Sequence, residues 1–193
     1  ALEIISSKAL LLEHLINDLF QLSKLESNQF SFNFMHLSAL DLSQQLVGKY
    51  LLDIKSAGIK PIVELDSGAL TGKNLIADPK RIDQVFSNII FNAIKYTEPG
   101  SKIKIKFGLD QDLNNYVVSV SDSGIGIPQE DLPFIFDRFF KARAPVRPGK
   151  EPGSGLGLTI SKEIISAHGG AISAKSNLGK GSTFTFTVPV YYD

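Results

Sequence analysis

The sequence from Pro79 to Thr97 is PKRIDQVFSNIIFNAIKYT, and it has the pattern of one amphipathic helix. Asp78 supplies an N-cap, and Pro79 then occupies the first turn, which is a common way for a helix to begin. At about 100° per residue, one side of this helix is entirely apolar and consists of Ile82, Val85, Phe86, Ile89, Ile90, Ala93 and Ile94. That side must be buried against other elements, so the segments around this helix decide the fold.

Around this helix, apolar residues occur either at helical spacing or in alternation. Residues 41–56 have helical spacing and stop at Gly58, and a second helical run begins after Gly157 and reaches about Ala167. Alternating runs predict strands at residues 59–65, 102–109, 116–121, 171–176 and 182–190. The runs at 102–109 and 116–121 form a predicted hairpin through a polar turn at 110–115. Because helices and strands do not alternate regularly, we predict an α+β fold with one sheet covered by helices on one face.

The first 27 residues have a different pattern. From residue 2 to residue 25, apolar residues fall on a, d and e positions of a heptad without an intervening Gly or Pro. A single helix cannot bury this stripe, so it is expected to need a second hairpin helix and a symmetry mate. After Asn28, the alternating residues Phe30, Phe32 and Phe34 predict a short strand. We therefore predict a partial helical segment at 1–27 and a domain at 28–193.

Composition excludes several functions. Twenty basic and twenty acidic residues give a formal net charge of zero, so no overall field favours nucleic acid or an anionic membrane. There is no cysteine, and three scattered histidines are too few to indicate a metal cluster. No apolar stretch is long enough to span a bilayer. We expect a soluble, cytoplasmic fragment, with a membrane anchor possible elsewhere in the full-length protein.

The polar side of the 79–96 helix carries Arg81, Gln84, Asn88, Asn92 and Lys95 within an arc of about 80°. A solvated helix face is the simple explanation for such an arc. However, asparagine is a poor helix former, whereas two amide oxygens at i and i+4 suit Mg²⁺ together with triphosphate oxygens. Lys95 lies one turn beyond Asn92, where it could meet the phosphates.

Two glycine-containing loops are candidates for nucleotide contacts. The loop Asp122-Ser-Gly-Ile-Gly-Ile-Pro128 follows a predicted strand, and its aspartate could accept a hydrogen bond from the exocyclic amine of adenine. A hairpin turn with an Asx motif explains the same residues. The loop Gly153-Ser-Gly-Leu-Gly-Leu158 opens a helix whose free N–H groups could cradle phosphate. It is not the dinucleotide-binding fingerprint, since no βαβ unit surrounds it, and it lacks the Gly-Lys-Ser/Thr of a Walker A loop.

A phenylalanine-rich segment at 134–140 and a Pro/Gly/basic loop at 141–152 lie between these glycine loops. We interpret them as a lid with an apolar anchor, although core packing accounts for at least two of the phenylalanines. The basic side chains that could hold a polyphosphate are those of Arg138, Lys141, Arg143, Arg147 and Lys150.

Taken in order, these segments resemble the histidine-kinase family of the GHKL ATPases. Residues 88–97 are similar to the family's N box, 122–128 to its G1 box, 136–140 to its F box, 153–158 to its G2 box and 179–184 to its last glycine box. The resemblance covers about residues 28–190, and residues 1–27 look like the second helix of the dimerisation and phosphotransfer hairpin. It implies a two-layer α/β sandwich with a mixed, mainly antiparallel sheet.

The resemblance also implies roles for individual residues. Asn92 would bind Mg²⁺ with Asn88 beside it, Lys95 would reach the phosphates of ATP, and Tyr96 would meet the nucleoside. Asp122 would bind the adenine amine. The remaining ATP contacts implied are Gly124, Gly126, Ile127, Phe136, Arg138 as a γ-phosphate contact, Gly153, Gly155, Leu156, Gly157, Leu158 and Thr183.

The activity implied is transfer of the γ-phosphoryl group of ATP to a histidine on a dimerisation helix, followed by relay to an aspartate of a response regulator, in a homodimeric full-length protein. The family's acceptor histidine is followed by an acidic residue, and His14, His36 and His168 are not. We therefore interpret all three as structural and expect the acceptor to be absent from this chain.

Two alternatives remain open from the sequence. A GHKL ATPase that hydrolyses ATP would need a glutamate as general base where this chain has Asn88, and an amide cannot take up a proton at neutral pH. A non-catalytic nucleotide-binding scaffold that dimerises through residues 1–27 would keep the same motifs. Phosphorylation of an acceptor hairpin supplied in trans separates this scaffold from a kinase.

Overall fold

The computed structural model describes residues 12–13, 16–24, 27, 31–142 and 154–192. Within these residues, seven strands form a sheet in the order β1-β3-β7-β5-β4-β2, and β6 pairs with the first half of β7 beside β3. The pairing of β2 with β4 is parallel and the other pairings are antiparallel. The strands are β1 Met35–Ser38, β2 Lys60–Leu65, β3 Asn74–Ala77, β4 Lys102–Leu109, β5 Asn115–Asp122, β6 Ile172–Asn177 and β7 Gly181–Tyr191.

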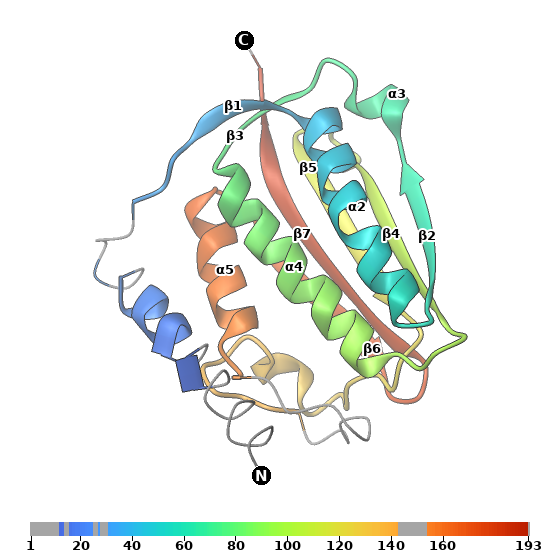
Figure 1. The fold of residues 1–193 in the computed structure, drawn as a ribbon. Helices are drawn as coiled ribbons and strands as arrows, with labels where there is room; N and C mark the ends of the chain where they lie inside the picture. Colours follow the sequence, from blue (N-terminus) through green and yellow to red (C-terminus); the bar gives the residue numbers. More distant parts are fainter. Residues whose placement is uncertain (1–11, 14–15, 25–26, 28–30, 143–153, 193) are drawn as a thin grey trace.

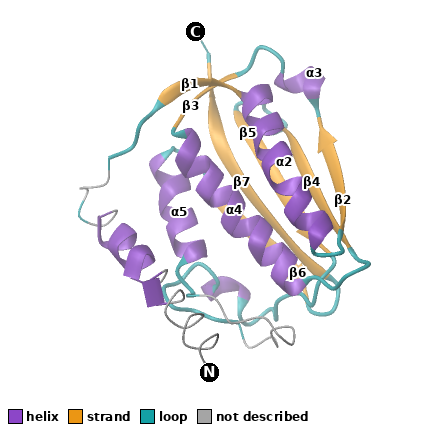
Figure 2. Ribbon diagram, viewed as in Figure 1, coloured by secondary structure: helices purple, strands orange, loops and turns teal. Residues whose placement is uncertain are grey.

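Three helices cover one face of this sheet, as Figures 1 and 2 show. They are α2 Ala39–Ser56, α4 Pro79–Tyr96 and α5 Gly157–Ala167, and α4 lies between the other two. Two short helices, α3 Ser67–Leu70 and the 3-10 helix η1 Leu132–Phe134, lie in connections. The predicted α+β class, with a mixed and mainly antiparallel sheet under one helical layer, is therefore confirmed.

Helix α4 forms where the sequence predicts it, with the Asp78 carboxylate accepting hydrogen bonds from the Lys80 and Arg81 amides. Its apolar side is buried: Ile82, Val85, Phe86, Ile89, Ile90, Ala93 and Ile94 are each at most 8% exposed. Phe86 packs on Phe107 of β4 with ring centroids 5.9 Å apart. Burying this side against the sheet leaves the opposite, polar side of α4 to face a cavity.

The predicted strand at 30–34 is wrong for the residues that can be described. Residues 31–34 have no regular structure, and β1 begins at Met35, paired with Ala77 of β3. Phe32 and Phe34 pack instead against the ring of His168, with centroids 5.5 and 4.9 Å away. The alternation of these phenylalanines therefore reflects a local aromatic cluster and not a strand. Phe30 lies outside the described residues.

The described part of the N-terminal segment, residues 12–13 and 16–24, is helical. Leu22 is only 3% exposed, and Gln21 Oε1 accepts a hydrogen bond from Gln84 Nε2 of α4 at 2.7 Å. Leu12, Ile16 and Leu19 of the predicted stripe, and Phe20 beside it, are at least 47% exposed, and packing of the stripe on a partner stays a prediction. The domain boundary after residue 27 stays a prediction. In the described part of the chain, no helix combines the length and hydropathy that a bilayer crossing requires.

His168 links the N-terminal end of α4 to the C-terminal end of α5. Its buried Nε2 accepts a hydrogen bond from the Asp78 backbone N–H at 3.0 Å, and its Nδ1 lies 2.7 Å from the Ile164 carbonyl oxygen. The imidazole is therefore neutral, with its proton on Nδ1. Burial lowers the pKa of His168 below its ordinary value of 6.5, despite the backbone hydrogen bond and the nearby Asp78 charge. The other histidine that can be described, His36, makes an edge-on contact with the Tyr191 ring, with centroids 5.2 Å apart, and is also structural. His14 lies outside the described residues.

Acidification should therefore destabilise the domain through His168. Because the folded pKa is lowered, the unfolded chain binds the proton first, and this contribution to stability is lost as the pH falls below about 6.5. We expect the free energy of unfolding to drop by up to about 1.4 kcal/mol per pH unit in that window. Urea unfolding at pH 7.5 and 5.5 measures this, and His168→Gln should reduce the slope while His36→Gln keeps it. Equal slopes in the parent and His168→Gln would contradict the assignment.

Candidate functional site

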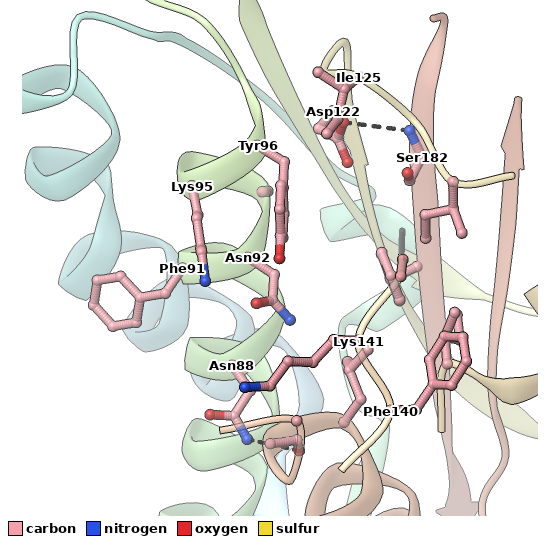
Figure 3. A pocket seen from close by; sticks show the side chains of 18 of the residues that line it. Asn88, Phe91, Asn92, Lys95, Tyr96, Asp122, Ile125, Phe140, Lys141 and Ser182 are labelled. Atoms are coloured by element: carbon pink, nitrogen blue, oxygen red, sulfur yellow. Dashed lines mark hydrogen bonds between the residues drawn. The ribbon is translucent and has the colours of Figure 1, made fainter. Parts of the chain in front are cut away.

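A cavity of about 540 Å³ lies between the C-terminal half of α4, the loop that follows β5 and the N-terminus of α5. Figure 3 shows its side chains. Asp122, Ile125 and Ser182 lie at one end, Asn88 and Lys141 lie toward the other, and Asn92 and Tyr96 lie between them. The cavity is lined by Asp18, Asn88, Phe91, Asn92, Ala93, Lys95, Tyr96, Asp122, Ile125, Gly126, Ile127, Ile135, Phe140, Lys141, Ala142, Ser154, Gly155, Gly157, Leu158, Ser182 and Phe184.

At the first end, the Asp122 carboxylate is fixed by backbone donors. Its Oδ1 accepts hydrogen bonds from the Gly124 amide at 2.8 Å and the Ser182 amide at 3.3 Å. Burial raises the pKa of Asp122 above its ordinary value, and these backbone bonds only partly offset the effect. The ionised carboxylate is thus an oriented acceptor in a half-buried, largely apolar pocket, which suits a ligand group that donates a hydrogen bond.

The loop from Asp122 to Ile127 is held on both sides. The Ile125 amide donates to the Tyr96 carbonyl at the end of α4, and the Ile125 carbonyl accepts from the Gly179 amide in the β6–β7 turn. Gly126 has φ of 70°, and a Cβ atom there would lie 2.1 Å from the Asn177 carbonyl oxygen. Glycine is therefore required at this position for both its conformation and its close approach to the turn.

At the opposite end, the N-terminus of α5 opens toward the cavity. Among the described residues, no side chain caps its first turn, so the backbone N–H groups of Gly157 and Leu158 are available on the cavity side of the helix. Together with the positive end of the helix dipole, these groups can bind an anion. The Asp18 carboxylate from the N-terminal helix accepts a hydrogen bond from Ser154 Oγ at 2.9 Å beside this site. An acidic side chain thus lies next to the place where an anion would bind.

Asn88 connects α4 to the start of α5. Its Nδ2 donates to the Gly157 carbonyl at 3.0 Å and lies 3.2 Å from Ser161 Oγ. The amide nitrogen is therefore engaged, and Oδ1 is the atom that a metal ion would contact. Asn92, one turn further along α4, points its amide into the cavity in Figure 3.

Lys95 and Tyr96 complete the wall that α4 provides. Lys95 Nζ lies 5.3 Å from the centroid of the Tyr96 ring, a cation–π contact. Burial raises the pKa of Tyr96, so its phenol stays neutral. Among the residues that the structure describes, no three His, Cys, Asp or Glu side chains form a metal cluster. The amide oxygens of Asn88 and Asn92 fit a Mg²⁺ ion that takes its other ligands from phosphate and water.

Ten of the predicted ATP contacts line the cavity together. They are Asn88, Asn92, Lys95, Tyr96, Asp122, Gly126, Ile127, Gly155, Gly157 and Leu158. Gly153 lies outside the described residues, as do Arg143, Arg147 and Lys150 of the predicted lid.

Five predicted contacts do not line the cavity, each for a structural reason. Thr183 faces the opposite side of β7, where Oγ1 bonds Ser121 Oγ at 2.9 Å. Phe136 packs against the core, with its carbonyl accepting from Thr159 Oγ1, and Leu156 is fully buried. Gly124 packs against the Tyr96 carbonyl, and Arg138 is exposed. Phe140 also packs against the core, which bears out core packing for at least two phenylalanines, whereas Phe134 and Phe139 are exposed.

Sequence reasoning missed Ser182 and Phe184, although a signal was present. Residues alternate along β7, so Ser182 and Phe184 face the same side as the buried Phe186, opposite Thr183. Applying that parity to the sequence would have selected Ser182. Asp18 carries no such signal, because it reaches the cavity only through the packing of the N-terminal helix.

Comparison with known proteins places this geometry in context. The profile of the family described as "Histidine kinase-, DNA gyrase B-, and HSP90-like ATPase" matches residues 77–192. The chain is 37% identical over 175 residues to the sensor histidine kinase WalK of Bacillus subtilis, which covers 91% of this chain and 28% of WalK. It is 34% identical over 189 residues to the sensor protein SrrB of Staphylococcus aureus, covering 98% of this chain and 31% of SrrB. The chain thus spans less than a third of the length of these relatives.

A solved structure gives the same fold with a response regulator present. Histidine kinase ThkA in complex with the response regulator protein TrrA superimposes with a TM-score of 0.74 at 29% identity, over 97% of this chain and 50% of that one.

Substitution of Gly126 tests the close approach that shapes the cavity. Gly126→Ala should reduce the free energy of unfolding more than Gly179→Ala. Both residues have φ near 70°, but a Cβ atom meets the Asn177 carbonyl only at position 126, and position 179 is open. The positive φ costs about 1–2 kcal/mol in either variant, and the overlap adds about 1–3 kcal/mol. Thermal unfolding of the two variants measures the difference, and equal losses would refute the tight packing of this loop.

Proposed function

The chain belongs to the family of histidine kinase-, DNA gyrase B- and HSP90-like ATPases, and on that premise we propose that it is the ATP-binding catalytic part of a sensor histidine kinase. It transfers the γ-phosphoryl group of ATP to a histidine on a dimerisation helix outside this sequence, for relay to an aspartate of a response regulator. The observation that carries the proposal is a single cavity with an oriented carboxylate at one end and an open helix N-terminus at the other.

The two ends suit the two ends of ATP. The adenine amine donates to Asp122 while the base packs against Ile125, Ile127 and the Gly126 backbone. The triphosphate then reaches toward the N–H groups at the start of α5. Lys95 and Lys141 line the cavity on the way from Asp122 to the start of α5, and both add positive charge.

Phosphoryl transfer needs positioning and charge neutralisation more than covalent help from the protein. Asn92, with Asn88 beside it, would hold a Mg²⁺ ion, and this ion would supply positive charge next to the phosphates. The Asn88 Nδ2 bond to Gly157 fixes the distance between this metal-binding helix face and the phosphate-binding turn.

Asn88 also favours transfer over hydrolysis. A hydrolytic member of the family requires a base that takes a proton from water, and the Asn88 amide cannot do so at neutral pH. Its nitrogen, in addition, already donates to Gly157 and contacts Ser161. An acceptor histidine is a nucleophile in its neutral form and needs no such base.

The partners follow from the same proposal. The exposed apolar residues Ile16, Leu19 and Phe20 pack on the other helices of a dimeric hairpin bundle. A response-regulator receiver domain then takes the phosphoryl group; the structure of ThkA with the response regulator protein TrrA supports this partner class.

The proposal is tested by calorimetric titration with ATP and GTP, with and without Mg²⁺, followed by addition of an acceptor hairpin and γ-labelled ATP. Selective, Mg²⁺-sensitive ATP binding with labelling of the hairpin is expected. Binding without labelling would favour a non-catalytic scaffold. Steady phosphate release without an acceptor would favour an ATP-hydrolysing enzyme.

Asp122→Asn should weaken ATP binding by about 10- to 100-fold, since a charge-assisted hydrogen bond is lost. The pKa of Asp122 is raised, so ATP affinity of the parent should fall with acidification, from a higher pH than an ordinary aspartate would give. The variant should lose this dependence. Calorimetry across pH measures both effects, with Asp112→Asn in the exposed β4–β5 turn as the matched control. An unchanged ATP affinity in Asp122→Asn would contradict the assignment of Asp122 as the residue that binds the adenine amine.

Asn92→Ala should lower the rate of labelling of the acceptor hairpin by at least about tenfold at saturating ATP, because a metal ligand is removed. Nucleotide binding without Mg²⁺ should change little. The exposed Asn114→Ala is the matched control and should keep the parent rate. A parent-like rate in Asn92→Ala would show that the metal is held elsewhere.

A further inference from the structure

Ser176 lies on β6, behind the end of the cavity that contains Asp122. It pairs across the sheet with Ser182 of β7 and is 8% exposed. Ser182 lines the cavity and Ser176 does not. Ser176 is therefore a buried polar residue one step removed from any ligand.

The Ser176 hydroxyl makes three hydrogen bonds. Its oxygen accepts from the Ile127 amide at 2.8 Å, its proton goes to the Gly181 carbonyl at 2.8 Å, and Ser182 Oγ lies 2.9 Å away. A serine hydroxyl has one proton and two lone pairs. Since the carbonyl of Gly181 can only accept, the arrangement that satisfies all three contacts makes Ser182 donate its proton to Ser176.

This arrangement fixes the character of the cavity wall. With its proton directed to Ser176, Ser182 Oγ presents only lone pairs toward the cavity. The Asp122 carboxylate beside it also only accepts, and its Oδ1 already takes the Ser182 backbone N–H. Both of these polar side chains are therefore acceptors, so this part of the wall favours a group with two N–H donors and disfavours a carbonyl oxygen.

Ser176 also holds the loop that faces the ligand. Its bond to the Ile127 amide joins β6 to the stretch of Gly126 and Ile127 that lines the cavity. The Ser176 carbonyl accepts a second bond, from Gln129 Nε2 just beyond the loop. The same residue thus sets both the position of the loop and the polarity of Ser182.

We propose that Ser176 is a positioning residue for recognition of a 6-amino purine, acting through Ser182 to make the base end of the cavity an acceptor-only wall. The inference rests on the proposed function, because it takes the Asp122 end as the site of the base. It adds a residue that does not touch the ligand and a chemical basis for rejecting 6-oxo purines.

The test compares affinities for ATP and inosine triphosphate, which carries a carbonyl in place of the amine, by calorimetry with Mg²⁺. In Ser176→Ala, the ratio of the two affinities should fall by about 3- to 10-fold, while inosine triphosphate binds within about twofold of the parent. Ser173→Ala removes an exposed hydroxyl from the same strand and should keep the parent ratio. Ser176→Thr, which retains the hydroxyl, should also keep the parent ratio of the two affinities.

Ser182→Ala should reproduce the reduced ratio, and the double variant Ser176→Ala/Ser182→Ala should reduce it no further, because the discrimination passes through Ser182. If Ser176→Ala does not fold, Ser182→Ala still tests whether the Ser182 hydroxyl carries the discrimination. Equal losses for both nucleotides, an unchanged ratio, or additive losses in the double variant would overturn the inference. A parent chain that binds neither nucleotide would instead refute the proposed function itself.

Discussion

Burial of one side of α4 against the sheet is the interaction on which the rest of this structure depends. Ile82, Val85, Phe86, Ile89 and Ile90 are each at most 1% exposed. Full burial of such side chains contributes about 1.5–3 kcal/mol each relative to leaving them exposed. Once this side is fixed, the rotation of the helix about its axis is fixed too, and its polar side must face the space between the β5–η1 connection and α5. The positions of Asn88, Asn92 and Lys95 are therefore consequences of core packing.

The remaining walls of the cavity are held to α4 by hydrogen bonds and close contacts. The loop after β5 is tied to the last turn of α4 through the Tyr96 carbonyl, and the first turn of α5 is tied to its middle through Asn88. At the far ends of the two helices, His168 and the Asp78 amide form a third connection. The site is thus supported by contacts along the whole length of the two helices.

The two ends of the cavity differ in their hydrogen-bonding groups. Acceptors gather where the β6–β7 turn meets the loop after β5, and backbone N–H donors gather where α5 begins. A ligand with an amine at one end and anionic groups at the other matches this order, and a uniformly charged or uniformly apolar ligand does not. The Asp18 carboxylate, carried by a helix from outside the sandwich, is the exception to the order, since it places negative charge at the donor end.

The sequence by itself determined the α+β class, the bounds of α4 and ten of the residues that meet in the cavity, because these depend on local periodicity, capping and the conformational needs of glycine. It misassigned Phe32 and Phe34 to a strand, since alternation alone does not reveal whether a strand partner exists. It selected Thr183 over Ser182, because the resemblance was applied without the alternation along β7, which puts Ser182 on the same side as the buried Phe186. Only the tertiary structure brought Asp18 and Ser176 to the site. Their contacts join residues far apart in sequence, and no local pattern encodes such distances.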